Sequence, residues 1–221
     1  MTTQDQRFAW PGWRGPFVHY GGLGPSFESR FDYVVIDVET TGFDPADGAR
    51  VLEVSAVRTD CSGSILDSFT TLLNPGVQDT GAEHIHGITM EMIANAPTFG
   101  DVFGHLVPLL NNAVFVAHHA KFDETFIAAE AKRAGISLST MPGLCTYWLS
   151  RQCQLDVPNH KLVTLAEYFG IDTGTSHSAY DDALVVAQML PMLSELAGSI
   201  EHYAQPQTQT EWPGLAQAAT R

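Results

Sequence analysis

Basic residues, cysteines and long apolar runs are all scarce in this 221-residue sequence. No apolar run approaches the roughly 20 residues that a membrane-spanning helix needs. Residues 1–15 also lack a basic region followed by an apolar one, which is the pattern of a secretory signal. These absences predict a cytoplasmic protein that does not enter a membrane.

The cysteines argue against a disulfide framework. There are three of them, Cys61, Cys145 and Cys153, an odd number without C-x-x-C spacing. Such usage favours a reducing compartment. A zinc site formed by Cys145, Cys153 and His160 is an alternative, but its spacing matches none of the usual zinc-ligand arrangements.

The scarcity of positive charge limits the ways in which this chain can bind nucleic acid. The sequence has 11 Lys and Arg residues and 25 Asp and Glu residues, which gives a formal net charge of −14. Such a protein repels polyanions as a whole, so long-range steering to a duplex is not expected. Nucleic acid stays a candidate ligand, because bound cations reverse the local sign of a carboxylate cluster and gripping a strand end needs few phosphate contacts.

Amino-acid composition and periodicity divide the chain into three zones. Residues 1–30 are rich in Gly, Pro and aromatics without a regular period, which predicts an irregular N-terminal arm. Residues 31–204 have a globular pattern, and the 44% hydrophobic content predicts one domain with one sizeable core. Residues 205–221 are polar and interrupted by Pro, which predicts a flexible tail.

The globular zone has the pattern of an α/β fold. Three β-rich runs are separated by short turn signals, which predicts an antiparallel meander. Alternating helices and strands follow. The meander covers residues 33–38, 51–59 and 65–73, the next strand covers 113–117, and the helices cover 99–110, 121–134, 162–169 and 179–196. We expect a mixed sheet of five strands with helices on its faces.

The first run carries two carboxylates, Asp37 and Glu39, on what reads as a buried strand. Residues i and i+2 of a strand share one face, so both side chains can reach a single cation. Removing unpaired charges from water is costly, and the apolar run before them offers no basic partner. The pair therefore predicts a divalent metal.

Two further aspartates lie where the fold could bring them to this pair. Asp123 opens a predicted helix after strand 113–117, and Asp182 lies in the first turn of the last helix. The helix dipole favours acidic residues in first turns, which is a sufficient explanation for either one alone. However, His177 precedes Asp182 by five residues and can face the same site. Asp181 points about 100° away from Asp182, so only one of the two can face the site well.

These residues lie in motifs that resemble the DnaQ-like 3'-5' exonucleases with a DEDDh active site. The motifs are Asp-Val-Glu-Thr-Thr-Gly at 37–42, His-His-Ala-Lys-Phe-Asp at 118–123 and His-Ser-Ala-Tyr-Asp-Asp at 177–182. His-Gly-Ile-Thr at 86–89 resembles an element of members related to the polymerase III proofreading subunit. The sequence departs from the family at His119, where Asn is frequent, and in its N-terminal arm.

The resemblance implies a ribonuclease H-like fold, two Mg²⁺ or Mn²⁺ ions and removal of nucleotides from a 3' end. It implies that Asp37 bridges both metals, that Glu39 and Asp182 complete the site of the nucleophilic water, and that Asp123 holds the second ion. His177 would take the proton of that water, since the ordinary histidine pKa of about 6.5 suits a general base.

Substrate contacts are expected around these motifs. Thr40 and Thr41 are placed to meet the terminal nucleotide, and Lys121 to meet a phosphate. Apolar side chains near the site can stack on any base, although core packing is an equally good explanation for Phe43, Ile88 and Phe122. The residues expected to contact substrate are Thr40, Thr41, Phe43, His86, Ile88, Lys121 and Phe122.

The leading hypothesis is a metal-dependent exonuclease that acts on 3' ends of single-stranded nucleic acid, with DNA favoured, and releases nucleoside 5'-monophosphates. The alternatives are trimming of RNA or short oligonucleotides, proofreading with a polymerase, and a binding module that works through its arm and tail. Residues 209–215 weakly resemble peptides that dock on sliding clamps, against the alternative of a plain flexible tail.

Overall fold

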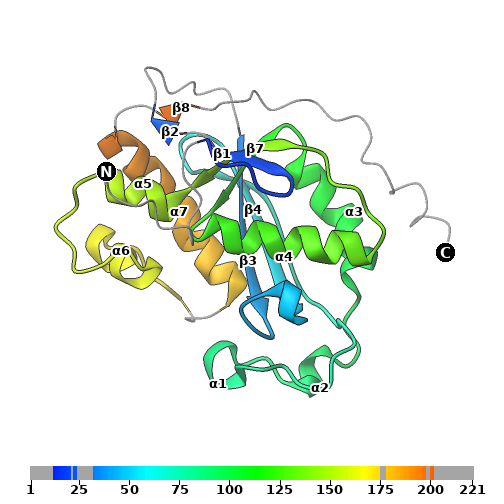
Figure 1. The fold of residues 1–221 in the computed structure, drawn as a ribbon. Coiled ribbons are helices and arrows are strands. Elements are labelled where there is room, and N and C mark those ends of the chain that lie inside the picture. The colour runs from blue at the N-terminus through cyan, green and yellow to red at the C-terminus, as the bar shows by residue number, and fades with distance from the viewer. Residues whose placement is uncertain (1–11, 21, 24–31, 175–177, 198–199, 202–221) are drawn as a thin grey trace.

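The protein was analysed as a computed structural model that describes residues 12–20, 22–23, 32–174, 178–197 and 200–201. Its centre is a six-stranded sheet in the order β1-β7-β6-β3-β4-β5 (Figure 1). The first three strands of the meander, β3, β4 and β5, pair antiparallel, whereas β6, β7 and β1 extend the sheet in parallel from β3. The bounds are β1 Val18–Tyr20, β3 Asp32–Thr40, β4 Val51–Thr59, β5 Ile65–Leu72, β6 Ala113–Ala117 and β7 Met141–Cys145.

Helices cover both faces of this sheet. The alternating side chains of the central strand divide the core, because Val34 and Ile36 pack with α3 and α4 whereas Val35 packs with α6 and α7. None of the described helices is long and apolar enough to cross a membrane. The helices are α1 Glu83–His86, α2 Met90–Ile93, α3 Phe99–Leu110, α4 Ala120–Arg133, α5 Thr146–Gln152, α6 Leu162–Phe169 and α7 Ala179–Ala197, with a 3-10 turn η1 at Pro45–Asp47 and a two-stranded sheet of β2 (Gly22–Leu23) and β8 (Ile200–Glu201).

The mixed α/β architecture confirms the predicted fold class, with six strands in place of the expected five. Two strands of this sheet, β7 and β1, were not located in the sequence, and β1 lies in the segment predicted to be irregular. That prediction is wrong for residues 18–20, because their strand conformation depends on pairing with β7 and not on a local sequence period. Where the arm and the tail begin and end stays a prediction.

Residues 12–20, which we call the N-terminal hairpin, fold back on themselves, and β1 forms the second half of this hairpin. Gly15 N–H donates to the Val18 carbonyl at 2.9 Å, and Tyr20 N–H donates to the Trp13 carbonyl at 3.1 Å. The hairpin is fastened to α4 by Glu124, a fully buried carboxylate. Glu124 accepts hydrogen bonds from the Phe17 and Val18 amides at 2.8 and 2.6 Å and from the Tyr20 hydroxyl at 3.1 Å. The hairpin is therefore a packed part of the domain.

Candidate active site

Three carboxylates meet at the carboxyl end of β3. Asp37, Glu39 and Asp182 each offer an oxygen atom, and these atoms all lie within 4.8 Å of one another. Parallel pairing of β3 with β6 ends at Val35 and Val116, so the two β3 carboxylates lie past the last paired residues on that side. The crevice beyond the carboxyl ends of strands is the usual ligand site of open α/β sheets. The strand pair thus lies together with Asp182, and the metal-binding role of the three side chains stays a prediction.

The start of α7 brings Asp182, and not Asp181, into this group. Ala179 N–H at the beginning of α7 donates to Glu53 Oε2 at 3.1 Å. Glu53 lies opposite Glu39 in the register of β3 and β4. Glu53 thus fastens the first turn of α7 beside the site, a role that the sequence analysis missed. A lone glutamate among the apolar residues of 51–57 was the only available signal.

Asp123 approaches the group from the first turn of α4 and is 3% exposed. Its carboxylate accepts hydrogen bonds from its own amide and from the Val38 amide on β3. Burial is the main reason that the pKa of Asp123 rises to about 8, and repulsion from Glu39 adds to it. Asp123 thus lies near enough to Asp37 and Glu39 for their charges to repel, beside the three carboxylates that meet at β3.

Repulsion among the buried carboxylates of this group favours the binding of a cation. Burial raises the pKa of Asp37 well above its ordinary range, and Asp123, Asp182, Glu39 and Glu53 repel its negative charge. Burial likewise raises the pKa of Glu39 to about 8, with further repulsion from Asp182 and Glu53. No basic residue appears among the groups that shift these carboxylates.

The donor atoms fit Mg²⁺ or Mn²⁺. Both ions prefer oxygen ligands, and carboxylate oxygens are the only donors in the group. Asp37, Glu39, Asp123 and Asp182 can hold such ions, because a divalent charge removes the repulsion that otherwise raises their pKa values. With such ions bound, this arrangement would bind and polarise a phosphate group.

The loop after β3, which carries Thr40 and Thr41, is held rigidly. Thr40 Oγ1 donates to the Gly42 carbonyl at 2.7 Å. Thr41 Oγ1 accepts from the Arg50 amide at 3.0 Å, and Thr41 N–H donates to the Arg50 carbonyl at 2.9 Å. Both hydroxyls thus hold the loop, and whether they also contact a nucleotide stays a prediction.

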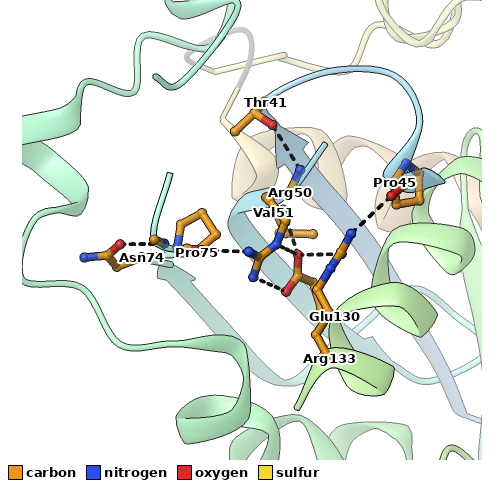
Figure 2. Close-up of polar contacts among 9 residues, drawn as sticks. Thr41, Pro45, Arg50, Val51, Asn74, Pro75, Glu130 and Arg133 are labelled. Carbon is orange, nitrogen blue, oxygen red and sulfur yellow. Dashed lines mark hydrogen bonds and ion pairs between the residues drawn. The ribbon is translucent and has the colours of Figure 1, made fainter. Parts of the chain in front are cut away.

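Figure 2 shows the ion-pair network behind this loop. The Arg50 guanidinium donates to both oxygens of buried Glu130, at 2.7 and 2.9 Å, and to the Pro75 carbonyl at 2.7 Å. Arg133 donates to the same carboxylate at 3.3 Å and to the Pro45 carbonyl at 3.1 Å. The network joins both ends of the loop to α4, which also carries Asp123.

The segment before α2 packs behind Thr41. Gly81 has a φ of +79° and lies so close to the Thr41 carbonyl that a Cβ would have no room. His86 is buried, with Nε2 3.2 Å from the Thr80 carbonyl and Nδ1 accepting from the Ile88 amide at 3.0 Å. Ile88 is 3% exposed and packs with Leu52. For His86 and Ile88 the structure shows packing roles.

Phe43, Lys121 and Phe122 line a common groove of about 440 Å³, together with His119. Phe43 is 90% exposed, which is unusual for so large an apolar side chain. Phe122 stacks on His119 with ring centroids 6.0 Å apart. The Lys121 ammonium lies 5.4 Å from the centre of the Trp13 ring of the N-terminal hairpin. These three predicted substrate contacts are therefore neighbours.

The alternative zinc site is not formed. In the described part of the chain, the only grouping of potential metal ligands is the carboxylate group at β3, which contains neither a cysteine nor His160. Cys145 is buried with its sulfur 3.5 Å from the His118 carbonyl, and His160 Nδ1 is 3.0 Å from Ser150 Oγ. These groups have packing partners of their own.

His118, in the second motif, acts as an internal link. Its Nδ1 is 3.0 Å from Thr146 Oγ1 and its Nε2 is 2.9 Å from the His160 carbonyl. Burial lowers its pKa to about 4, so the ring is neutral near physiological pH. His177 and residues 209–215 lie outside the described residues, so the predicted general base and the predicted clamp-binding peptide stay predictions.

Comparison with known proteins places this site in a family. The family model RNase_T, described as Exonuclease, matches residues 34–190. The chain is 32% identical over 166 residues to the DNA polymerase III subunit epsilon of Aquifex aeolicus, covering 74% of this chain and 81% of that protein. It is 33% identical over 169 residues to the 3'-5' exonuclease DinG of Bacillus subtilis, covering 74% of this chain and 18% of DinG.

The solved structures agree on the fold. The nuclease domain of 3'hExo, a DEDDh family member bound to rAMP, has a TM-score of 0.63 at 17% identity, covering 81% of this chain and 100% of that chain. This similarity shows that the fold is the ribonuclease H-like fold of DEDDh exonucleases. The chain spans only between 11% and 30% of the length of five other curated relatives, DinG among them.

The family match covers all four carboxylates of the site, and the motifs around them are those of the DnaQ-like members. The chain therefore belongs to the RNase_T exonuclease family.

Proposed function

We propose that this protein removes nucleotides from the 3' end of single-stranded nucleic acid, with DNA favoured, and releases nucleoside 5'-monophosphates. The observation that carries the proposal is the meeting of Asp37, Glu39 and Asp182 within 4.8 Å at the carboxyl end of β3. Asp123 completes the group from α4. A site this rich in carboxylates, with burial raising their pKa values, suits phosphoryl chemistry on a metal-bound substrate.

The metal in this proposal is a pair of Mg²⁺ or Mn²⁺ ions held by Asp37, Glu39, Asp123 and Asp182. When bound, such ions supply activation of a water molecule and stabilisation of the charge that develops on the phosphate. Activity with Mg²⁺ and with Mn²⁺ distinguishes between the two ions.

The protein's own residues supply positioning and proton transfer. The α4 turn and the Val38 amide hold Asp123 in place, and Glu53 holds the α7 turn that carries Asp182. His177 precedes Asp182 by five residues and is the proposed general base that takes the proton from the attacking water. Phe43 and Phe122 supply the apolar surfaces on which the terminal bases stack.

The preference for single strands is supported by charge. A protein with a net charge of −14 has little long-range attraction for a duplex, whereas a 3' end in a carboxylate and metal site needs few phosphate contacts. Sugar discrimination depends on contacts to the 2'-hydroxyl, so the alternative of trimming RNA or short oligonucleotides is decided by direct comparison.

The experiment uses matched 5'-labelled DNA and RNA strands, single and double, incubated with Mg²⁺ or Mn²⁺. We expect a ladder of products shortened from the 3' end and release of nucleoside 5'-monophosphates. Asp37→Ala should give no ladder, and a chelator should stop the wild-type reaction. Equal shortening by wild type and Asp37→Ala would overturn the proposal.

A second candidate role is proofreading in association with a polymerase. The observation that favours it is the relative named DNA polymerase III subunit epsilon, of which this chain spans 81%. The arm or the tail, including residues 209–215, would then contact a polymerase or a sliding clamp, in the cytoplasm. Co-elution of the purified protein with a purified polymerase on gel filtration tests this role, and separate elution contradicts it.

A further inference from the structure

The groove of Phe43 and Phe122 continues along α4, away from the carboxylate site. A second groove of about 890 Å³ follows the other half of the helix and reaches Ile136 and Leu138. The two grooves share the lining residues Pro45 and Thr125 and so adjoin each other, and together they form the channel that we call the α4 groove. It begins next to the turn that carries Asp123.

One side of α4 runs through the whole channel. Lys121, Thr125, Ala128 and Lys132 have the i, i+4, i+7 and i+11 spacing of one helix face, and all four line the channel. Between the two lysines the side chains are short, while Phe17 of the N-terminal hairpin and Ile136 give the second half apolar walls. The 14 residues of α4 span about 21 Å, so the groove is long enough for several nucleotides.

The charge of the α4 groove is opposite to that of the protein as a whole. Its lining contains Lys121, Lys132 and Arg133, against a single acidic residue, Asp44. The whole chain has 25 acidic and 11 basic residues. Basic side chains are therefore concentrated along this groove, and a polyanion is the ligand whose charge complements it.

Two of the three basic side chains, Lys121 and Arg133, have contacts that hold them in position. The Lys121 ammonium lies against the Trp13 ring, and Arg133 is fixed by Glu130 and the Pro45 carbonyl. Lys132 is exposed at the far end of the helix. Apolar walls between fixed cations are the combination that grips single strands, since bases stack on the walls and phosphates meet the cations.

We propose that the α4 groove holds the nucleotides upstream of the 3'-terminal nucleotide, with Lys121 near the site and Lys132 at the far end meeting successive parts of the backbone. This inference rests on the proposed function, because it takes the 3' end to lie at the carboxylates. In this proposal α4 binds the nucleic acid, whereas the end of β3 and the first turns of α4 and α7 carry the carboxylates for catalysis.

The test compares Lys132→Gln with Lys161→Gln in the full chain. Both replace one exposed lysine, but Lys161 precedes α6 and does not line the groove. The substrates are a 12-nucleotide single strand, which fills the groove, and a dinucleotide, which does not. KM and kcat are measured for each substrate at several salt concentrations.

For the 12-nucleotide strand, we expect Lys132→Gln to raise KM about threefold to tenfold, with kcat unchanged, and to reduce the dependence of log KM on log salt by about 0.7, the value of one single-strand phosphate contact. For the dinucleotide, Lys132→Gln should equal wild type. Lys161→Gln should equal wild type on both substrates.

Equal KM values and salt slopes for the two variants on the long strand would overturn the inference, and a groove that binds a peptide instead would give that result. The inference would also be overturned if the wild-type protein hydrolysed both substrates with equal KM values. That result would leave the proposed function intact. A wild-type protein that hydrolyses neither substrate would overturn the proposed function, and the inference with it.

Discussion

Adjacent residues of α4 bury their carboxylates in opposite ways. Asp123 joins Asp37, Glu39 and Asp182, where the neighbouring charges repel one another. Glu124 accepts three hydrogen bonds from the N-terminal hairpin, and Glu130 two turns later is paired with Arg50 and Arg133. The carboxylates of the first group repel one another, whereas Glu124 and Glu130 are held by hydrogen bonds and ion pairs.

The surroundings of a buried carboxylate decide whether it stabilises or destabilises the fold. A buried carboxylate with donors around it stabilises the fold, and removing it leaves those donors without a partner. A buried group of repelling carboxylates destabilises the fold until a cation binds. Carboxylates on the same helix therefore serve stability at Glu124 and Glu130 and, in the proposed function, metal binding at Asp123.

The largest effect should come from the repelling group. Replacing Asp37 with Asn should lower kcat/KM at least about 1000-fold, because the substitution removes a central ligand of the metal site. The same variant should unfold at an equal or higher temperature, since one repelled charge is gone. Steady-state kinetics and thermal unfolding in a chelator check both outcomes.

Asp67→Asn serves as the matched control, because Asp67 is exposed on β5. It should change neither quantity. A clear fall in the unfolding temperature of Asp37→Asn would break the comparison, since Asp37 would then contribute to folding as Glu124 and Glu130 do.

The next largest effect should come from the satisfied group. Glu130→Ala should lower the free energy of unfolding by about 3 kcal/mol, because the Arg50 fork and the Arg133 contact lose their acceptor. Urea unfolding monitored by circular dichroism measures it. Glu167→Ala, at an exposed position of α6, should stay within about 0.5 kcal/mol of wild type. Equal losses in the two variants would contradict the assigned role of Glu130.

A smaller effect should appear as a dependence of stability on pH. Burial raises the pKa values of Glu39 and Asp123 to about 8, whereas in the unfolded chain both carboxyls titrate near their ordinary values of about 4. The folded state therefore keeps protons that the unfolded state has lost, and this stabilisation disappears as the pH rises through about 8. In a chelator, we expect the melting temperature to fall by about 5 °C between roughly pH 6 and pH 9.

Addition of Mg²⁺ or Mn²⁺ should remove most of that fall, because bound cations replace the protons. Glu39→Gln should flatten the profile in the chelator for the same reason. A melting temperature that rises with pH in the chelator would show that the carboxylate group is not repulsive in the folded protein.

The smallest effect concerns the contact between the hairpin and α4. Gly15 lies against the Glu124 carboxylate with no room for a Cβ, so Gly15→Ala should destabilise the protein by about 1 kcal/mol. Gly104→Ala is the matched control, since Gly104 lies in α3 with no atom near its missing Cβ, and alanine favours helices. Urea unfolding of both variants should give opposite signs, and a neutral Gly15→Ala would weaken the case that the hairpin is tightly packed.

Local patterns predicted much of the fold. The helices at 99–110 and 162–169 match α3 and α6, and the predicted helix at 121–134 is α4 displaced by one residue. β7 was not located, because its sequence Met-Pro-Gly-Leu-Cys contains two residues that weaken any strand pattern. β1 was not located because three residues carry too short a pattern to read.

The site was predictable to the extent that it depends on short spacing. The two-residue period of β3 placed Asp37 with Glu39, and the spacing from His177 favoured Asp182 over Asp181. Contacts that join distant parts of the chain were not predictable. Glu53 reaches Ala179 across 126 residues, and Glu124 reaches Phe17 across 107, and neither spacing leaves a local pattern.

The pairing of β1 with β7 changes what counts as the smallest stable unit. The family match begins at residue 34, after the N-terminal hairpin, yet β1 forms three pairs along β7 and covers that edge of the sheet. A polypeptide cut at residue 34 would leave the backbone amides and carbonyls of buried β7 open to pairing with other chains. Residues 12–20 thus protect this edge of the sheet against aggregation, separately from any part they have in binding or cleavage.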